Sequence, residues 1–182
     1  VNQYAHFIFP AWLDTMQKMP ESCAVMGSPP GARVPPFLFF DYSQLGEIVS
    51  EKGQCLGLMN WIDRLSNWPT DETAYQRHKE QWLEAMIEAL DQAFPGIRES
   101  IVYREMATPR TVKAYLNDPA GGVHGFGDPE LTKENKSFHR GCMTAVEGLL
   151  LASSFAFGPG YSKAILTGAV AAENAFRSLK NY

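Results

Sequence analysis

The sequence has few cysteines, and they do not form a group. Its 182 residues contain three, Cys23, Cys55 and Cys142, an odd number at wide spacing. They form neither a disulfide framework nor a Cys-x-x-Cys metal or redox motif. Isolated thiols of this kind are typical of a reducing compartment, so we expect a cytoplasmic protein.

A basic block is also missing. Sixteen Lys and Arg residues against twenty Asp and Glu residues give a formal net charge of −4. Nucleic-acid binding depends on clustered positive charge that neutralises phosphates. The charge pattern therefore excludes nucleic acid as the expected partner.

Long apolar runs are absent as well. No stretch reaches the roughly 18 apolar residues that a membrane-spanning helix needs, and the opening segment VNQYAHFIFPAWLD lacks the charged and apolar regions of a signal peptide. Because the chain begins with Val1, we expect a portion of a longer protein, and removal of a short leader would give the same appearance.

Signatures of metal and hydrolase sites are missing too. The four histidines do not form an i, i+4 pair and do not lie near a cluster of Cys, Asp and Glu, so we expect no metal site. Neither Ser153 nor Ser162 lies in a G-x-S-x-G motif, which disfavours nucleophilic catalysis.

The residues that are present favour a layered globular fold, since 45% are hydrophobic and 12% aromatic. Apolar runs predict strands in HFIFPAWL and at 37–40, 55–62, 100–106 and 147–155. Helical spacing predicts a long helix over Asp71–Phe94, capped by Thr70, a short helix over Thr108–Tyr115, and a terminal helix after Gly158. We therefore predict a mixed α/β or α+β fold, in which a sheet of about four to six strands has the long helix on one face and the terminal helix on the other.

Two glycine-rich segments are candidates for binding. In the first, NDPAGGVHGFGDP, we expect the backbone to pass close to another group, with positive φ at Gly121-Gly122 and Gly125. In the second, the turn GPGYSK precedes the terminal helix and places backbone N–H groups at its N-terminus, which suits an anion or an electron-rich oxygen. An ordinary strand-to-helix connection explains that turn equally well, because it matches neither a G-x-G-x-x-G fingerprint nor a P-loop.

From Tyr75 onward the sequence resembles a known family. The segments YQRHKEQWLEAMIEALDQAFPGI, ATPRTVKAYLNDPAGGVHGF and GLLLASSFAFGPGYSKAILTGAVAAENAF, in this order, resemble the C-terminal, substrate-side region of FAD-dependent oxidoreductases related to phytoene desaturase, carotenoid isomerase and retinol saturase. These enzymes belong to the amine-oxidase flavoprotein superfamily. The resemblance implies a substrate-side domain over 1–147 and, over 148–182, a strand and helix that close an FAD-binding domain whose N-terminal Rossmann-like half is absent.

The family's site residues follow from the same resemblance. It implies flavin contacts for Ser153, Ser154, Gly158, Gly160, Tyr161 and Ser162, and substrate contacts for Gly122, His124 and Phe126. It names no catalytic residue. Because the G-x-G-x-x-G unit that holds the pyrophosphate is absent, we expect this chain alone to bind FAD weakly or not at all.

The implied activity is desaturation, saturation or isomerisation of an apolar, polyene-like substrate, with the flavin carrying out the difficult chemistry. The expected partners are that substrate and the N-terminal half, and two further associations stay open: peripheral binding to a membrane, and a homodimer through the orphaned interface. The alternative hypothesis is a non-catalytic domain that binds an apolar ligand or a partner protein.

Overall fold

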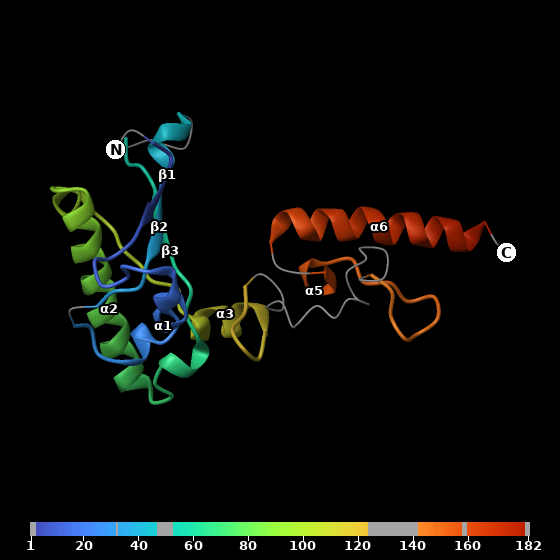
Figure 1. Cartoon of the computed structure of the whole chain (residues 1–182), viewed down its shortest axis with the longest axis horizontal. Coiled ribbons are helices and arrows are strands. Elements are labelled where there is room, and N and C mark those ends of the chain that lie inside the picture. Colours follow the sequence, from blue (N-terminus) through green and yellow to red (C-terminus); the bar gives the residue numbers. More distant parts are fainter. Residues whose placement is uncertain (1–2, 32, 47–52, 124–141, 158–159, 181–182) are drawn as a thin grey trace. The chain divides into compact units, whose positions relative to one another are not determined.

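The structure is a computed structural model that describes the chain outside residues 1–2, 32, 47–52, 124–141, 158–159 and 181–182. The chain divides into two compact units, Val1–Gly121 and Gly122–Tyr182. Figure 1 shows the elements of both units, and each unit is described by itself below.

The first unit is built on a three-stranded antiparallel sheet with the order β1-β2-β3. The strands are β1 (Ala5–Ile8), β2 (Phe37–Asp41) and β3 (Gly57–Asn60), and each overlaps a segment predicted to be a strand. The central strand buries Phe37 and Phe39, whereas Leu38 and Phe40 on its other side are half-buried. The most continuously apolar run therefore occupies the middle of the sheet, as its composition predicts.

The predicted long helix is confirmed as α2 (Glu72–Ala93). Its buried side chains, including Trp82, Met86 and Leu90, form one core cluster with Phe37 and Phe39 of the sheet. The predicted cap was wrong by one residue, because the carboxylate of Asp71 accepts the amide hydrogen bond from Ala74 at 2.8 Å. Asp and Thr are both common N-cap residues, so the spacing of the apolar residues does not decide whether Thr70 or Asp71 caps the helix.

Short elements complete the first unit. The predicted short helix is confirmed as α3 (Pro109–Leu116), which begins after the capping residue Thr108. The others are α1 (Met19–Ser22) and the 3-10 turns η1 (Met16–Lys18), η2 (Val25–Gly27), η3 (Tyr42–Leu45), η4 (Leu65–Asn67) and η5 (Arg98–Ser100).

The strand predicted over 100–106 is not formed. This segment follows η5 without joining the sheet, and Val102 and Tyr103 are 75% and 77% exposed. Met106 at its end is buried in the core cluster, and Arg104 forms ion pairs with Glu80 and Glu84 of α2. β-propensity alone does not make a strand when a segment has no ladder partner.

The second unit contains α5 (Ser154–Phe157) and α6 (Tyr161–Leu179), which pack on each other. The terminal helix is thus confirmed, but the strand predicted over 147–155 is not formed, since Leu150 makes only an isolated bridge with Met143 and α5 begins at Ser154. The described residues therefore contain a purely antiparallel sheet of three strands, not a mixed sheet of four to six. Packing of the terminal helix on the sheet involves both units and stays a prediction.

Candidate functional site

The turn before α6 carries most of the predicted flavin contacts. Gly160 is the N-cap of α6 with φ +99° and ψ 163°, a conformation that only glycine adopts readily. No side chain among the described residues caps the helix there. Tyr161 and Ser162 of the first turn are exposed, and Gly158 lies outside the described residues. In the described part of this turn, backbone groups thus present the positive end of the helix dipole.

Ser153 and Ser154 lie at the start of α5 and not on a strand. The carbonyl oxygen of Ser153 accepts hydrogen bonds from the hydroxyl of Thr167 at 3.0 Å and from the amide of Ala156 at 3.1 Å. Thr167 is completely buried, so this bond ties the start of α5 to the middle of α6. The side chains of both serines are half-buried.

The predicted substrate loop is described only at its beginning. Gly122 is half-buried, and His124 and Phe126 lie outside the described residues, as does Gly125. Of the glycines predicted to have positive φ, Gly121 has φ +70°, whereas Gly122 is not among the residues with positive φ.

Gly121 passes very close to the start of α3. A Cβ atom on Gly121 would lie 2.4 Å from the carbonyl oxygen of Pro109, far inside van der Waals contact. This confirms that the loop backbone approaches another group. Within the first unit, Gly121, the first glycine of the glycine loop, is therefore in direct contact with the T-P-R-T element.

The T-P-R-T element is fixed by a buried hydrogen-bond network. Thr108 and Thr111 form a reciprocal capping box, in which the Thr108 hydroxyl accepts from the Thr111 amide at 3.3 Å and the Thr111 hydroxyl accepts from the Thr108 amide at 3.1 Å. The Thr108 hydroxyl also lies 2.9 Å from the hydroxyl of Tyr75 on α2. These bonds hold the first turn of α3 against the long helix.

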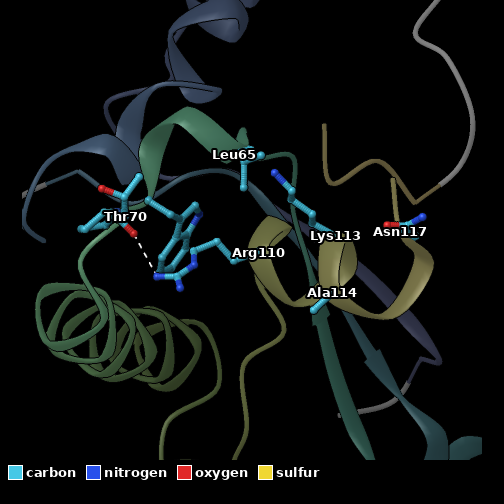
Figure 2. A pocket seen from close by; sticks show the side chains of 8 residues that line it. Leu65, Thr70, Arg110, Lys113, Ala114 and Asn117 are labelled. Carbon is cyan, nitrogen blue, oxygen red and sulfur yellow. Dashed lines mark hydrogen bonds between the residues drawn. The ribbon is translucent and has the colours of Figure 1, made fainter. Parts of the chain in front are cut away.

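Sequence reasoning missed a pocket beside α3 (Figure 2). It has a volume of about 540 Å³, within the size range of sites for small organic molecules. It is lined by Leu65, Trp68, Pro69, Thr70, Arg110, Lys113, Ala114 and Asn117. Arg110, Lys113 and Ala114 of α3 lie at i, i+3 and i+4, which places them on one helix face, and Asn117 is the C-cap of the helix. No local pattern pairs these residues with the segment 65–70.

The two cationic side chains that line this pocket, Arg110 and Lys113, differ in how firmly neighbouring groups hold them. Arg110 donates to the carbonyl of Pro69 at 3.0 Å and to the carboxylate of Glu72 at 2.8 Å, and its guanidinium lies 3.9 Å from the Tyr75 ring centroid. Hydrogen bonds from Gln76 and then from Arg110 hold the pKa of Glu72 below its usual range. Lys113 is exposed, and Figure 2 shows its side chain extending from α3 along the pocket. Arg110 is therefore structural, and Lys113 is the cation available to a ligand.

The opposite wall of the pocket is held by Asp63. Its carboxylate accepts hydrogen bonds at 2.6 Å from the Trp68 indole and at 2.6 Å from the Asn67 amide. The wall is thus preformed. The lining residues supply neither a nucleophile paired with a base nor a carboxylate pair, and no group of metal-ligating side chains occurs among the residues that the structure describes. The pocket is suited to binding and not to acid-base or metal chemistry.

A third feature is an apolar face of the sheet on the side away from the core cluster. The strand register places Phe7 opposite Leu38 and Leu58 opposite Phe40, and all four alternate with core-facing residues. Phe7 is 63% and Leu58 is 43% exposed, and they flank the half-buried Leu38 and Phe40. This face is therefore a candidate site for an apolar ligand or for another protein surface.

Within the described part of the chain, no helix combines the length and apolar character that crossing a bilayer requires. No family model matches the sequence, and no solved structure matches it. Among curated proteins, the chain is 30% identical over 110 residues to all-trans-retinol 13,14-reductase of Danio rerio. The alignment covers 59% of this chain but only 17% of that protein's length. The chain is thus distantly similar to a short part of a retinol reductase.

Proposed function

We propose that this chain is the C-terminal, substrate-side region of a flavin-dependent oxidoreductase that acts on an apolar, polyene-like substrate. The 30% identity over 110 residues to a retinol 13,14-reductase carries the proposal, because that name describes reduction of a polyene alcohol. The reaction of the intact protein is a desaturation, saturation or isomerisation, for which a bound flavin supplies the redox chemistry.

The apolar sheet face supports an apolar substrate. A polyene offers no charged group, so its binding depends on burial of its own apolar surface against a matching surface. Phe7, Leu38, Phe40 and Leu58 provide such a surface on the first unit. The family resemblance assigns further substrate contacts to the loop residues Gly122, His124 and Phe126.

The segment before α5 supports the proposal that the intact protein supplies further strands to pair with it. Leu149 and Leu151 are 51% and 46% exposed, although the run GLLLA has the composition of a buried strand. A buried parallel strand forms only between neighbouring strands that pair with its backbone. In the proposed enzyme these neighbours belong to the N-terminal FAD-binding half.

The chemistry at the start of α6 fits a flavin. A helix N-terminus that no described side chain caps offers backbone donors and a positive dipole, which stabilise negative charge on a reduced flavin ring. We infer that the flavin contacts come from this turn and the preceding one, at Ser153, Ser154, Gly158, Gly160, Tyr161 and Ser162. Their part is to bind and orient the ring and to favour its reduced form.

The test compares the purified chain with a longer polypeptide that carries its native upstream sequence. We expect a stoichiometric yellow complex with FAD only for the longer polypeptide, seen as a perturbed flavin absorbance spectrum. Gly160→Val, which forces a β-branched residue into a conformation that suits glycine, is expected to weaken that complex. Gly96→Val, at φ +91° with open space around it and outside the proposed flavin and sheet contacts, is the matched control. A longer polypeptide that folds and takes up no flavin contradicts the proposal.

A second candidate function is binding of an apolar ligand without redox chemistry, and the pocket beside α3 favours it. Its preformed wall includes Trp68, which lets tryptophan fluorescence report binding of all-trans-retinol to the chain alone. Ala114→Phe fills the pocket, whereas Ala120→Phe changes an exposed residue outside its lining. Saturable binding that only Ala114→Phe abolishes supports this candidate, and non-saturable binding rejects it.

A further inference from the structure

One face of α6 carries large apolar side chains that its own unit leaves uncovered. Tyr161, Ile165, Phe176 and Leu179 are 82%, 73%, 61% and 74% exposed. At 3.6 residues per turn, they fall with two exposed alanines within about 80° of the helix circumference. We call this line the α6 stripe: Tyr161, Ile165, Ala169, Ala172, Phe176 and Leu179. The buried residues Thr167 and Ala171 lie on the other side of the helix, so the stripe is not the face that packs inside the unit.

The order of large and small residues in the α6 stripe is the same from either end. From each end, two large residues are followed by one alanine. If a second α6 lies antiparallel on the first, Tyr161 meets Leu179, Ile165 meets Phe176, and Ala169 meets Ala172. The midpoints of the three pairs fall at Val170 or between Val170 and Ala171, within half a residue of one another. The stripe is therefore complementary to itself under a two-fold rotation, which is the requirement of an isologous dimer contact.

The small residues at this centre allow close approach of two helices. Besides the two alanines, Gly168 lies nearby, and a Cβ atom added there meets nothing within 4 Å. Interaxial distances between packed helices are about 8–10 Å and depend on the side chains at the contact. Alanine at the centre suits the short end of this range, and the large residues on both sides then pack around the crossing.

The charges near the α6 stripe do not oppose this pairing. The stripe itself contains no charged residue. Glu173 and Arg177 lie beside it and pair with each other at 2.6 Å. Lys180 lies at its end, with the ammonium 4.6 Å from the centroid of the Phe176 ring. The central contact can thus be buried without removing an unpaired charge from water.

We propose that the α6 stripe is the contact surface of a symmetric homodimer in which α6 pairs antiparallel with α6 of a second copy. A partner of different sequence would not require the two halves of the stripe to match, whereas a second copy does. The proposal does not depend on the proposed enzymatic function, with which it shares only Tyr161. Burial of the four large side chains supplies the driving force.

The first test measures the mass of the full chain by light scattering and by sedimentation over a range of concentrations. We expect a dimer. Ile165→Glu and Phe176→Lys are each expected to raise the dimer dissociation constant by about 100-fold or more, since each leaves an unpaired charge in the contact. Both substitutions in one chain restore the dimer, because the new carboxylate of one copy then faces the new ammonium of the other. Ser178→Lys, off the stripe, is the control, and circular dichroism checks that every variant keeps its helix content.

The second test fixes the register by disulfide trapping in a background with Cys23→Ser and Cys55→Ser. A mixture of a Tyr161→Cys chain with a Leu179→Cys chain is expected to give cross-linked dimers that contain one copy of each. The Tyr161→Cys chain alone is expected to give none, because its two thiols lie at opposite ends of the contact. A monomer at every concentration, a dimer that the charge substitutions do not change, or cross-links between two Tyr161→Cys chains would each overturn the proposal.

Discussion

The contact between Gly121 and Pro109 predicts a large and specific effect of one methyl group. In Gly121→Ala the new Cβ atom would lie 2.4 Å from the Pro109 carbonyl oxygen and 3.0 Å from its carbonyl carbon. These are backbone atoms at the first turn of α3, so they cannot rotate away as the end of a flexible side chain does. Either the loop or the start of α3 has to move.

The expected cost has two parts. A non-glycine residue at φ +70° costs roughly 1–2 kcal/mol, and forcing an extra carbon into a packed site costs roughly 1–3 kcal/mol more. We therefore expect Gly121→Ala to lower the free energy of unfolding of the first unit by about 3 kcal/mol, a large fraction of the stability of a domain. Gly96→Ala is the matched control: its φ is +91°, and an added Cβ meets nothing within 4 Å. Gly96→Ala is expected to lower the free energy of unfolding only by the roughly 1–2 kcal/mol that a non-glycine residue costs at positive φ.

The assay is urea unfolding followed by tryptophan fluorescence. All four tryptophans lie in the first unit, so the signal reports on that unit alone. The midpoint should fall further for Gly121→Ala than for Gly96→Ala, with the slope of the transition unchanged. Equal losses in the two variants would refute the reasoning, because the contact with Pro109 would then contribute nothing.

Three further predictions concern the same unit. Thr108→Val, which leaves the buried Tyr75 hydroxyl without its partner and removes the cap of α3, is expected to cost about 2 kcal/mol by urea unfolding, whereas Thr108→Ser keeps most of the stability. Trp82→Ala, at a site that is 1% exposed, is expected to cost about 3–5 kcal/mol in the same assay. The pKa of Asp41 lies below its usual range, since partial burial raises it but hydrogen bonds led by the Ser43 hydroxyl lower it more. A lowered pKa stabilises the fold above the unfolded-state value, so the stability difference between the wild type and Asp41→Asn should shrink as pH falls through the folded pKa, as unfolding curves between pH 7 and pH 2 would show.

Local sequence patterns predicted those elements whose stability is local. The helix over Glu72–Ala93 follows from its apolar period, and the start of α3 follows from Thr108 and Pro109, because a cap and a fixed φ act within one turn. The strands of the sheet were also found, since Phe37–Phe40 is apolar at consecutive positions and lies between its two partners. The positive φ of Gly121 was predicted as well.

Elements that depend on distant partners were not predictable in this way. The segment 100–106 has the composition of a strand, but it lies along α2, where Arg104 binds Glu80 and Glu84. These contacts join residues 20 or more positions apart, so the local composition does not predict them. The pocket beside α3 was missed for the same reason, because the contact between Arg110 and Pro69 spans 41 residues. Of the site residues inferred from the family resemblance, Ser153 and Ser154 lie at the start of α5 and not on the predicted strand, and Gly160, Tyr161 and Ser162 lie at the start of α6.

The distribution of buried apolar residues separates the two units physically. Of the thirteen buried hydrophobic residues among those described, only Cys142 and Ala171 belong to the second unit. The same unit exposes Leu149 and Leu151 before α5 and the residues of the α6 stripe. So few buried side chains leave little apolar burial to offset the conformational entropy lost on folding. The described part of the second unit thus leaves apolar surface that each of the two proposals would cover.

The two proposals supply different surfaces for these two exposed groups. The flavin-binding half would pair with the segment around Leu149 and Leu151, and a second copy would cover the α6 stripe. Mass measurements on the longer polypeptide separate them: a dimer that Ile165→Glu dissociates while FAD stays bound shows that both surfaces are used together. If the longer polypeptide is instead a monomer that binds FAD, and Ile165→Glu releases the flavin, the upstream half covers the stripe. The homodimer would then be rejected, and the flavoprotein assignment would stand.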